Sequence, residues 1–147
     1  MAHDTIEVVI AGAVILRGEH YLIARRSEHE EEYPGVLSFV SGTIEPEDFV
    51  QADVLHAMLR REIREEVGVE VADFRYVGST VFENTRGESV LSIIFLCRYI
   101  SGEARAVDPL EVSEVLWMSA AEFLAHPDAP PWNCKTMQDC EVLRYTL

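Results

Sequence analysis

Apolar residues occur in short runs that are separated by polar or glycine-containing segments. Residues 7–16 are rich in Val and Ile, and residues 21–24 form a second apolar run after the polar stretch 17–20. Short runs with β-branched residues are typical of buried strands, and a short polar gap with glycine favours a hairpin. The pattern therefore predicts that a sheet begins with these two strands.

A second group of elements follows an acidic segment. Residues 27–34 contain four glutamates, whose mutual repulsion predicts a solvated loop. After a short apolar run at 37–40, a loop leads into a predicted helix with Asp53 as its N-cap and Gly68 at its end. Three further strands are predicted, over 74–82, 90–99 and 114–118.

The C-terminal part of the sequence predicts two helices. Glu122 follows Ser119 by three residues, the spacing of a capping box, so a helix is expected to start here and to run through Ala125. Prolines then break the chain before a closing helix over 133–144. No internal repeat or interdomain linker is present, and one domain over 1–147 is expected.

The helix predicted between Asp53 and Gly68 has one apolar face. Its apolar residues recur at helical spacing and are expected to pack against the sheet. This stripe consists of Leu55, Met58, Leu59, Ile63 and Val67.

Three glutamates lie along the edge of this stripe. Glu62 and Glu66 are four residues apart and Glu65 is three from Glu62, so the carboxylates are neighbours on the helix. Partial burial raises the cost of their repulsion, because each charge also loses hydration. By angle, Arg61 and Arg64 point mostly to the other side of the helix. A divalent cation such as Mg²⁺ or Mn²⁺ is the sharper candidate for the counter-charge, although a cluster of this kind taken alone is more often a solvated helix face.

Composition limits the function. The chain has 147 residues, 48% of them hydrophobic, which suits one globular domain. The formal net charge of -14 would repel a long phosphate backbone, which argues against a nucleic-acid platform. A small phosphorylated substrate remains compatible with this charge, because a bound divalent cation inverts the local field.

Cysteine usage and hydropathy point to the cytoplasm. Cys97, Cys134 and Cys140 form no C-x-x-C pair and leave an odd thiol in any disulfide scheme, which suits a reducing compartment. The most apolar early stretch, 8–16, is too short to span a bilayer and lacks a basic flank before it. A cytoplasmic protein without a membrane helix or signal peptide is expected.

The run 61–69 resembles the second half of the Nudix box: Arg-Glu, apolar, any, Glu-Glu, any, Gly, apolar. All of its specified positions are filled. The full pattern begins earlier, with a glycine that is followed after five residues by a glutamate. Seven further residues then separate this glutamate from the Arg-Glu pair. Gly42 and Asp48 have the first spacing, but twelve residues separate Asp48 from Arg61. Asp53 has the second spacing, so either aspartate is a candidate for the first glutamate.

The resemblance implies the Nudix fold, an α/β/α sandwich around a mixed sheet. It also implies that Glu62, Glu65 and Glu66 hold the Mg²⁺ or Mn²⁺ ion. The backbone carbonyl of Ser41 is a candidate for a further metal contact. Arg61 is expected to steady the glutamates through a salt bridge.

Further acidic and basic residues are candidates by the same resemblance. Glu111, or alternatively Glu114, resembles a glutamate that precedes the strand ending in tryptophan and acts as a metal ligand or base. Metal-activated water would attack a diphosphate, and Glu65 or Glu111 would accept the proton. Arg25 and Arg26, at the end of the second strand, are the first candidates for a phosphate contact.

Other side chains give weaker signals. Arg86 is a second candidate for a phosphate contact. Phe82, Tyr33 and Trp132 could stack on a base, but aromatic residues at strand ends are more often core, so none is assigned.

Three functions compete. A hydrolase of a nucleoside triphosphate or a nucleotide sugar is favoured by the intact second half of the box. A nucleotide-binding or regulatory module that does not hydrolyse its ligand is favoured by Ser41 in place of a glycine, by Asp48 and by the extra residues. An isomerase of isopentenyl diphosphate ranks last, because its catalytic cysteine has no counterpart near the box. A homodimer is a further expectation.

Overall fold

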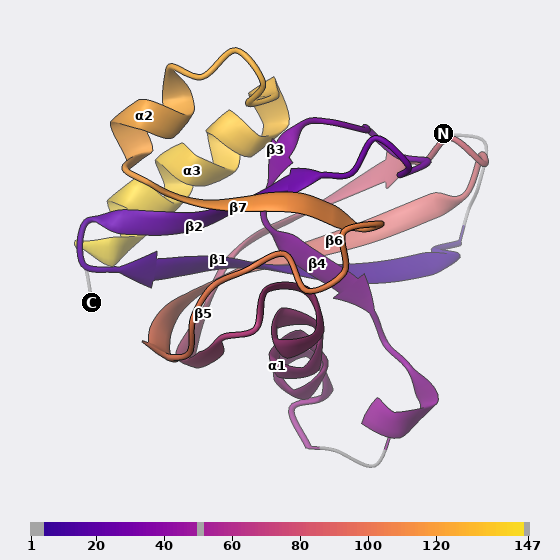
Figure 1. The fold of residues 1–147 in the computed structure, drawn as a ribbon. Coiled ribbons are helices and arrows are strands. Elements are labelled where there is room, and N and C mark those ends of the chain that lie inside the picture. Colours follow the sequence, from indigo (N-terminus) through magenta and orange to yellow (C-terminus); the bar gives the residue numbers. More distant parts are fainter. Residues whose placement is uncertain (1–4, 50–51, 146–147) are drawn as a thin grey trace.

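The structure is a computed structural model that describes residues 5–49 and 52–145. Within this part of the chain, seven strands form one sheet with helices on both faces (Figure 1). The strands are β1 (Val8–Arg17), β2 (His20–Arg26), β3 (Leu37–Ser38), β4 (Val40–Thr43), β5 (Glu70–Glu83), β6 (Ser89–Ser101) and β7 (Val112–Met118). The helices are η1 (Pro46–Asp48), α1 (Val54–Val67), α2 (Ala120–Leu124) and α3 (Pro131–Arg144).

The sheet is mixed. Its main order is β3-β2-β1-β6-β5, while β4 pairs with β1 and β7 pairs with β2. The β1–β6 pair is parallel, with Gly12 opposite Ile94, and the other pairs are antiparallel. Because β1 pairs with β4 at one end and with β2 at the other, it anchors both halves of the sheet.

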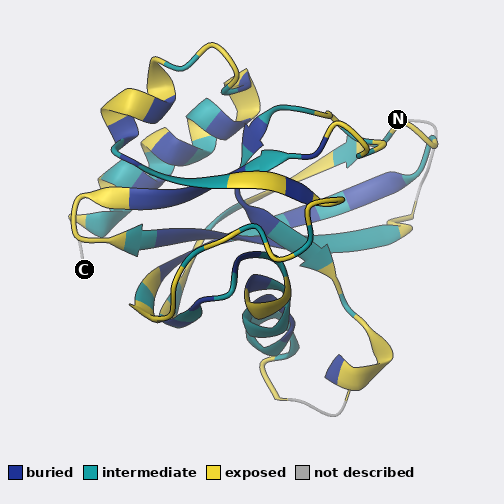
Figure 2. Ribbon diagram, in the orientation of Figure 1, coloured by how far each residue is buried: buried dark blue, intermediate teal, exposed yellow. Residues whose placement is uncertain are grey.

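The two faces of the sheet carry separate cores. On one face α1 packs against β1, β4 and β6, and its predicted stripe is buried except for the partly buried Leu55. On the other face α2 and α3 cover a second cluster that includes Tyr21, Phe123 and Met137. Figure 2 shows the buried residues on the strands and on the inner sides of these helices. The α/β/α sandwich is therefore confirmed.

Most predicted elements are confirmed, with differences at their ends. β5 begins at Glu70 rather than near residue 74, because register shifts interrupt its pairing with β6 and obscure the alternation. The capping box of α2 is present, with Ser119 Oγ accepting from the Glu122 amide. Asp53 occupies the N-cap position of α1, but within the described residues its side chain makes no capping hydrogen bond.

The acidic segment 27–34 is a mostly exposed loop, as predicted, but both of its ends are tied to the sheet. Ser27 is buried, and its amide donates to the Glu111 carbonyl at 3.0 Å. Two backbone hydrogen bonds from Arg26 and Gly35 close the segment onto the end of β2. Charge repulsion alone therefore did not decide its position, because backbone pairing holds both of its ends.

No helix in the described ranges has the length and apolarity that a membrane crossing requires.

We expect Ile63→Ala to lower the free energy of unfolding by about 2–5 kcal/mol, because the Ile63 side chain is fully buried between α1 and the sheet. Val142→Ala on the exposed side of α3 is the matched control, with an expected change below about 0.5 kcal/mol. Urea unfolding followed by circular dichroism measures both. Equal losses in the two variants would contradict the packing of α1 described above.

Candidate active site

The candidate site lies where β4 meets α1. Ser41 pairs with Gly12 of β1, which places the next residue, Gly42, directly under α1. A Cβ atom added to Gly42 would lie only 2.4 Å from the Glu62 carboxylate carbon. Real carbon atoms do not approach so closely, so the absence of a side chain at Gly42 allows Glu62 to reach the backbone of β4.

Arg61 joins α1 to the loop that precedes it. Its Nη2 donates to Asp48 Oδ2 at 2.9 Å and its Nη1 donates to Glu62 Oε1 at 3.0 Å. The Thr43 carbonyl at 3.3 Å is a third acceptor. At the solvent side, the guanidinium also meets Glu65 at 3.3 Å. These acceptors raise the pKa of Arg61 further above its ordinary value, chiefly through Asp48, so the charge is fixed.

The direction of Arg61 differs from the one predicted by angle. The helical wheel placed it mostly away from the glutamates, whereas its long side chain bends back toward them and toward Asp48. Arg64 does point away, to Glu70 at 2.6 Å. A helical wheel gives only the direction of the Cα–Cβ bond. The guanidinium group of an arginine lies several bonds further out, so it can bend away from that direction.

Asp48, rather than Asp53, belongs to this network. Its carboxylate is buried, receives Arg61 and also accepts from the Glu45 amide at 2.9 Å, which closes η1. The hydrogen bond from Arg61 lowers the pKa of Asp48, followed by the one from the Glu45 amide. The residues added to the box pattern fall between η1 and α1, and residues 50–51 lie outside the described part of the chain.

Glu62, Glu66 and Glu111 form a coupled acidic cluster. Burial is the main cause that raises the pKa of Glu66 to about 9, and the charges of Glu62 and Glu111 and a hydrogen bond with Glu111 contribute to the same rise. Burial is also the main cause that raises the pKa of Glu62, while Arg61 acts in the opposite direction. A carboxyl group can donate a hydrogen bond to another carboxyl group only when it is protonated. The charges of Arg61 near Glu62 and of Arg26 near Glu66 offset only part of the burial and repulsion in this cluster.

The segment before β7 brings Glu111 to α1. The amides of Arg105 and Val107 donate to the carbonyls of Val67 and Glu66, at 3.1 and 3.0 Å. These bonds satisfy carbonyls at the C-terminal end of α1 and dock the segment there. Glu114, the alternative candidate, lies on β7 and pairs with Arg25 at 2.8 Å instead.

Arg25 and Arg26 face different surroundings, as neighbours on a strand must. Arg25 is held by Glu114, by Asp128 at 2.9 Å and by the Gly35 carbonyl. Arg26 lines a cavity that also includes Ser41, and its charge acts on Glu66 by lowering the pKa of that carboxyl. The structure thus brings Arg26, and not Arg25, to the acidic cluster. Arg86 pairs with Glu31 at 2.7 Å.

The acidic cluster has the donor chemistry of a divalent cation site. Mg²⁺ and Mn²⁺ prefer carboxylate and carbonyl oxygens, and Glu62, Glu66, Glu111 and the Ser41 carbonyl offer only such atoms. A cation bound here would favour the ionised form of these carboxyl groups, because metal ligands must be deprotonated. Within residues 5–49 and 52–145, however, no three acidic, His or Cys side chains are arranged as a ready metal site. Arg61 holds Glu62 and Glu65 instead.

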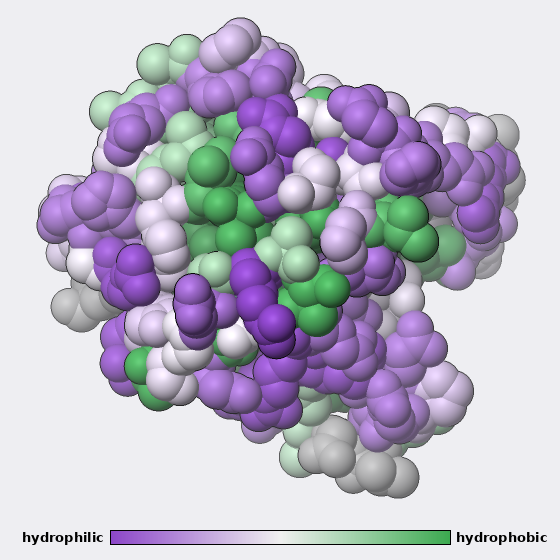
Figure 3. Space-filling model, viewed as in Figure 1, coloured by the Kyte–Doolittle hydropathy of each residue, from purple (hydrophilic) through white to green (hydrophobic). Residues whose placement is uncertain are grey.

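A cavity of about 300 Å³ opens beside this cluster, over β1, β4 and β6. The aromatic residues left unassigned from the sequence, Tyr33, Phe82 and Trp132, all line it, although they come from three distant segments. Tyr33 and Trp132 are in contact, with ring centroids 4.9 Å apart. On the face shown in Figure 3, hydrophilic residues dominate the surface and an apolar area lies near its centre.

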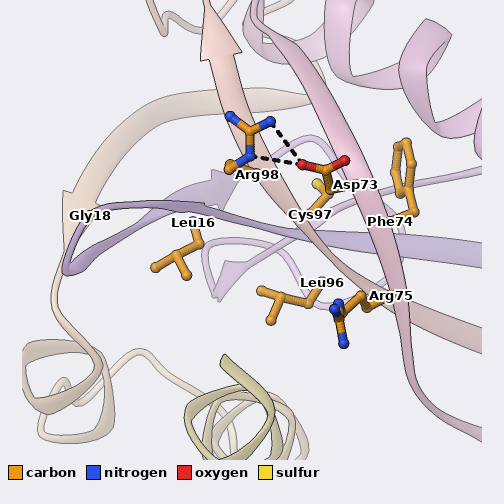
Figure 4. A pocket seen from close by; sticks show the side chains of 8 residues that line it. All are labelled: Leu16, Gly18, Asp73, Phe74, Arg75, Leu96, Cys97 and Arg98. Atoms are coloured by element: carbon orange, nitrogen blue, oxygen red, sulfur yellow. Dashed lines mark hydrogen bonds and ion pairs between the residues drawn. The ribbon is translucent and has the colours of Figure 1, made fainter. Parts of the chain in front are cut away.

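A second cavity, of about 520 Å³, lies at the opposite end of β1 (Figure 4). It is lined mainly by apolar side chains such as Leu16, Phe74 and Leu96, and its charged groups include the paired Asp73 and Arg98. Gly18, at the edge of this cavity, follows the last residue of β1. Gly12, which pairs with Ser41 of the candidate site, lies in the first half of that strand. The smaller cavity is the one that adjoins the candidate site, because Ser41 and Arg26 line it and neither lines the larger cavity.

Sequence reasoning missed one feature of this site. Glu32 lines the smaller cavity, and the sequence placed it in a solvated acidic loop. Its main partner, Thr85, is 53 residues away in the β5–β6 hairpin. No local pattern signals a contact at that separation.

Comparison with known proteins agrees with this geometry. The family model of the NUDIX domain matches residues 7–140. The NAD-capped RNA hydrolase NudC of Pseudomonas aeruginosa is 35% identical over 106 residues, which cover 72% of this chain and 34% of that protein. The uncharacterized Nudix hydrolase YfcD of Escherichia coli is 34% identical over 108 residues, 73% of this chain and 56% of that protein. The chain thus spans between a third and somewhat more than half of these relatives' length.

Solved structures share the fold. The MutT protein of Methanosarcina mazei matches with a TM-score of 0.75 at 20% identity, over 97% of this chain and 99% of that one. The NUDIX domain of Shewanella oneidensis NrtR, solved with ADP ribose, matches with a TM-score of 0.76 at 16% identity, over 95% and 90%. With a family model that covers nearly its whole length, the chain belongs to the NUDIX domain family.

Proposed function

We propose that this protein is a divalent-metal-dependent hydrolase that cleaves the diphosphate linkage of a nucleotide-like substrate, either a nucleoside triphosphate or a nucleotide sugar. The observation that carries the proposal is the partly buried, charge-deficient cluster of Glu62, Glu66 and Glu111 beside Gly42. The relatives named as hydrolases support the same reaction class. Mg²⁺ or Mn²⁺ is the proposed cation, because both favour oxygen ligands.

The residues have distinct proposed roles. Glu62, Glu65, Glu66 and the Ser41 carbonyl hold the cation, and Arg61 orients Glu62 and Glu65 as a positioning residue. When bound, the cation supplies charge neutralisation and acidifies water. Glu65 or Glu111 accepts the proton of the attacking water, and Glu111 is the better placed of the two because it already contacts Glu66.

Substrate phosphates also need a positive side chain. Arg26 is the proposed contact, since it lines the adjoining cavity and its charge acts on Glu66. Arg25 is a weaker candidate, because two carboxylates, Glu114 and Asp128, hold its guanidinium at 2.8 and 2.9 Å, whereas Arg26 meets one, Glu30, at 3.3 Å. The cytoplasmic location and the homodimer expected from the sequence and the family remain predictions.

A binding module without turnover is the second candidate. The salt bridges from Arg61 to Glu62 and Glu65 favour it, because they keep both carboxylates away from a cation. Phosphate and pyrophosphate release from a panel of nucleotides and nucleotide sugars, with Mg²⁺ or Mn²⁺ and with an EDTA control, separates the two. Metal-dependent cleavage of any member supports the hydrolase. Nucleotide binding without cleavage would replace it by the binding module.

Glu65→Gln should reduce turnover by about 10²–10³-fold, because several kcal/mol of charge stabilisation or proton transfer would be lost. Folding should be unaffected, since the Glu65 side chain is largely exposed. Initial rates under saturating substrate measure the effect, with Glu103→Gln on an exposed loop as the control. Turnover at the unmodified level in Glu65→Gln would remove Glu65 from the proposed site.

Gly42→Ala should lower activity sharply while the protein stays folded. The added methyl group would occupy the position of the Glu62 carboxylate and displace it. Gly78→Ala is the control, because a Cβ at Gly78 meets no described atom within 4 Å. Assays of both variants, with thermal unfolding to check the fold, test this. Full activity of Gly42→Ala would show that the Glu62 position is not needed.

Adding Mg²⁺ should raise the melting temperature, and EDTA should reverse the rise. A ligand that binds only the folded state adds about 2.7 kcal/mol when its free concentration is 100 times its Kd. The shift should be much smaller in Glu66→Gln, which loses a carboxylate oxygen and its charge. Thermal unfolding at several Mg²⁺ concentrations measures it. A shift of the same size in Glu66→Gln would place the ion elsewhere.

A further inference from the structure

The smaller cavity contains a carboxylate oxygen without a partner. Glu32 Oε1 accepts from the Thr85 amide at 3.0 Å and from the Thr85 hydroxyl. Its other oxygen, Oε2, is buried and has no hydrogen-bond partner among the described residues. A buried acceptor without a protein partner is costly, so a ligand that places a donor at this oxygen would gain from satisfying it.

Glu32 is also fixed in place. Arg26 Nε donates to the Glu32 carbonyl at 2.8 Å, which holds the backbone from the β2 side. Thr85 holds the side chain from the β5–β6 hairpin. The carboxylate therefore does not have to be ordered when a ligand binds, and such preorganisation favours selective recognition.

Aromatic rings define the shape of the same cavity. Tyr33 and Trp132 meet at its rim with an interplanar angle of 50°, and about half of each residue remains exposed. Phe39 and Phe82 line it further in. A planar heterocycle that stacks on these rings would cover apolar surface that now faces solvent.

The two asparagine side chains of the cavity are already engaged in hydrogen bonds. Asn84 Oδ1 already accepts from the amides of Arg86 and Glu88, and its Nδ2 donates to the Glu88 carboxylate. Asn133 Nδ2 donates to the Leu37 carbonyl at 3.0 Å. A ligand edge that meets Glu32 must present hydrogen-bond donors, because an ionised carboxylate only accepts.

We propose that this cavity binds the base of the substrate and selects guanine over adenine, with Glu32 Oε2 accepting from the N1–H and the exocyclic amino group. An ionised carboxylate is an acceptor only. Guanine presents two adjacent donors on this edge, whereas adenine places the N1 lone pair beside its single amino group. Because Ser41 borders both the cavity and the acidic cluster, a base held here leaves its phosphates toward Glu62.

This inference rests on the proposed function for the direction of the phosphates, but its test does not require hydrolysis. Nucleoside monophosphates have no diphosphate linkage, so their binding is independent of turnover. Equilibrium titrations of the full chain with GMP, IMP and AMP in EDTA, followed by tryptophan fluorescence, give three dissociation constants. GMP should bind roughly ten- to a hundredfold more tightly than AMP. IMP, which lacks the amino group, should lie between them.

Glu32→Gln gives the sharper test. The carboxamide oxygen of this glutamine can still accept from Thr85. Its NH₂ group then stands where Oε2 was and presents an N–H donor to the base. The GMP preference should disappear or reverse in favour of AMP, whereas Glu31→Gln should retain it, because Glu31 lies at the surface and pairs with Arg86. Trp132→Ala should weaken all three ligands by a similar factor, about tenfold, measured by isothermal titration calorimetry because this variant lacks the tryptophan of the cavity.

The outcomes separate the two proposals. Equal or tighter binding of AMP by the unmodified protein, or an unchanged GMP-to-AMP ratio in Glu32→Gln, would overturn the guanine assignment. If the nucleotide panel shows no cleavage but GMP is preferred, the hydrolase proposal fails and the base assignment stands. If nucleotides are cleaved but GMP is not preferred over AMP, the base assignment fails and the hydrolase proposal stands.

Discussion

The guanidinium of Arg61 is the interaction on which the site depends. It connects α1 to Asp48 in η1 and to the Thr43 carbonyl at the end of β4, while it also holds Glu62. One side chain thus fixes the helix relative to the loop and provides the positive charge nearest to the acidic residues. Because the Arg61 and Asp48 side chains are largely buried, loss of either would leave the other as an uncompensated charge.

The acidic cluster shows why the two faces of the sheet differ. The face under α2 and α3 is a conventional apolar core, whereas the face under α1 gives part of its edge to carboxylates that repel one another. Carboxylates that are grouped to bind a cation repel one another whenever the cation is absent. The backbone bonds that dock Arg105 and Val107 against α1 hold Glu111 close to Glu66 in spite of that cost.

Local patterns predicted what local physics decides. The stripe of α1, the hairpin of β1 and β2 and the capping box at Ser119 all follow from spacing, and the structure confirms them. The family resemblance supplied the sandwich and the box glutamates. The sequence could not give the bend of Arg61 toward Asp48 or the partnership of Glu32 with a distant threonine, because both depend on tertiary contacts.

The parallel pairing of β1 with β6 has a consequence for how the protein reaches its folded state. Val8 lies opposite Val90, so more than half of the chain separates the two partners. Closing so large a loop costs entropy before any contact compensates for it, and chains rich in such non-local pairs fold slowly. The smaller cavity uses residues on both strands, so it is complete only once this long-range pair has formed. The shape of the cavity therefore depends on the same distant contact that joins the two halves of the sheet.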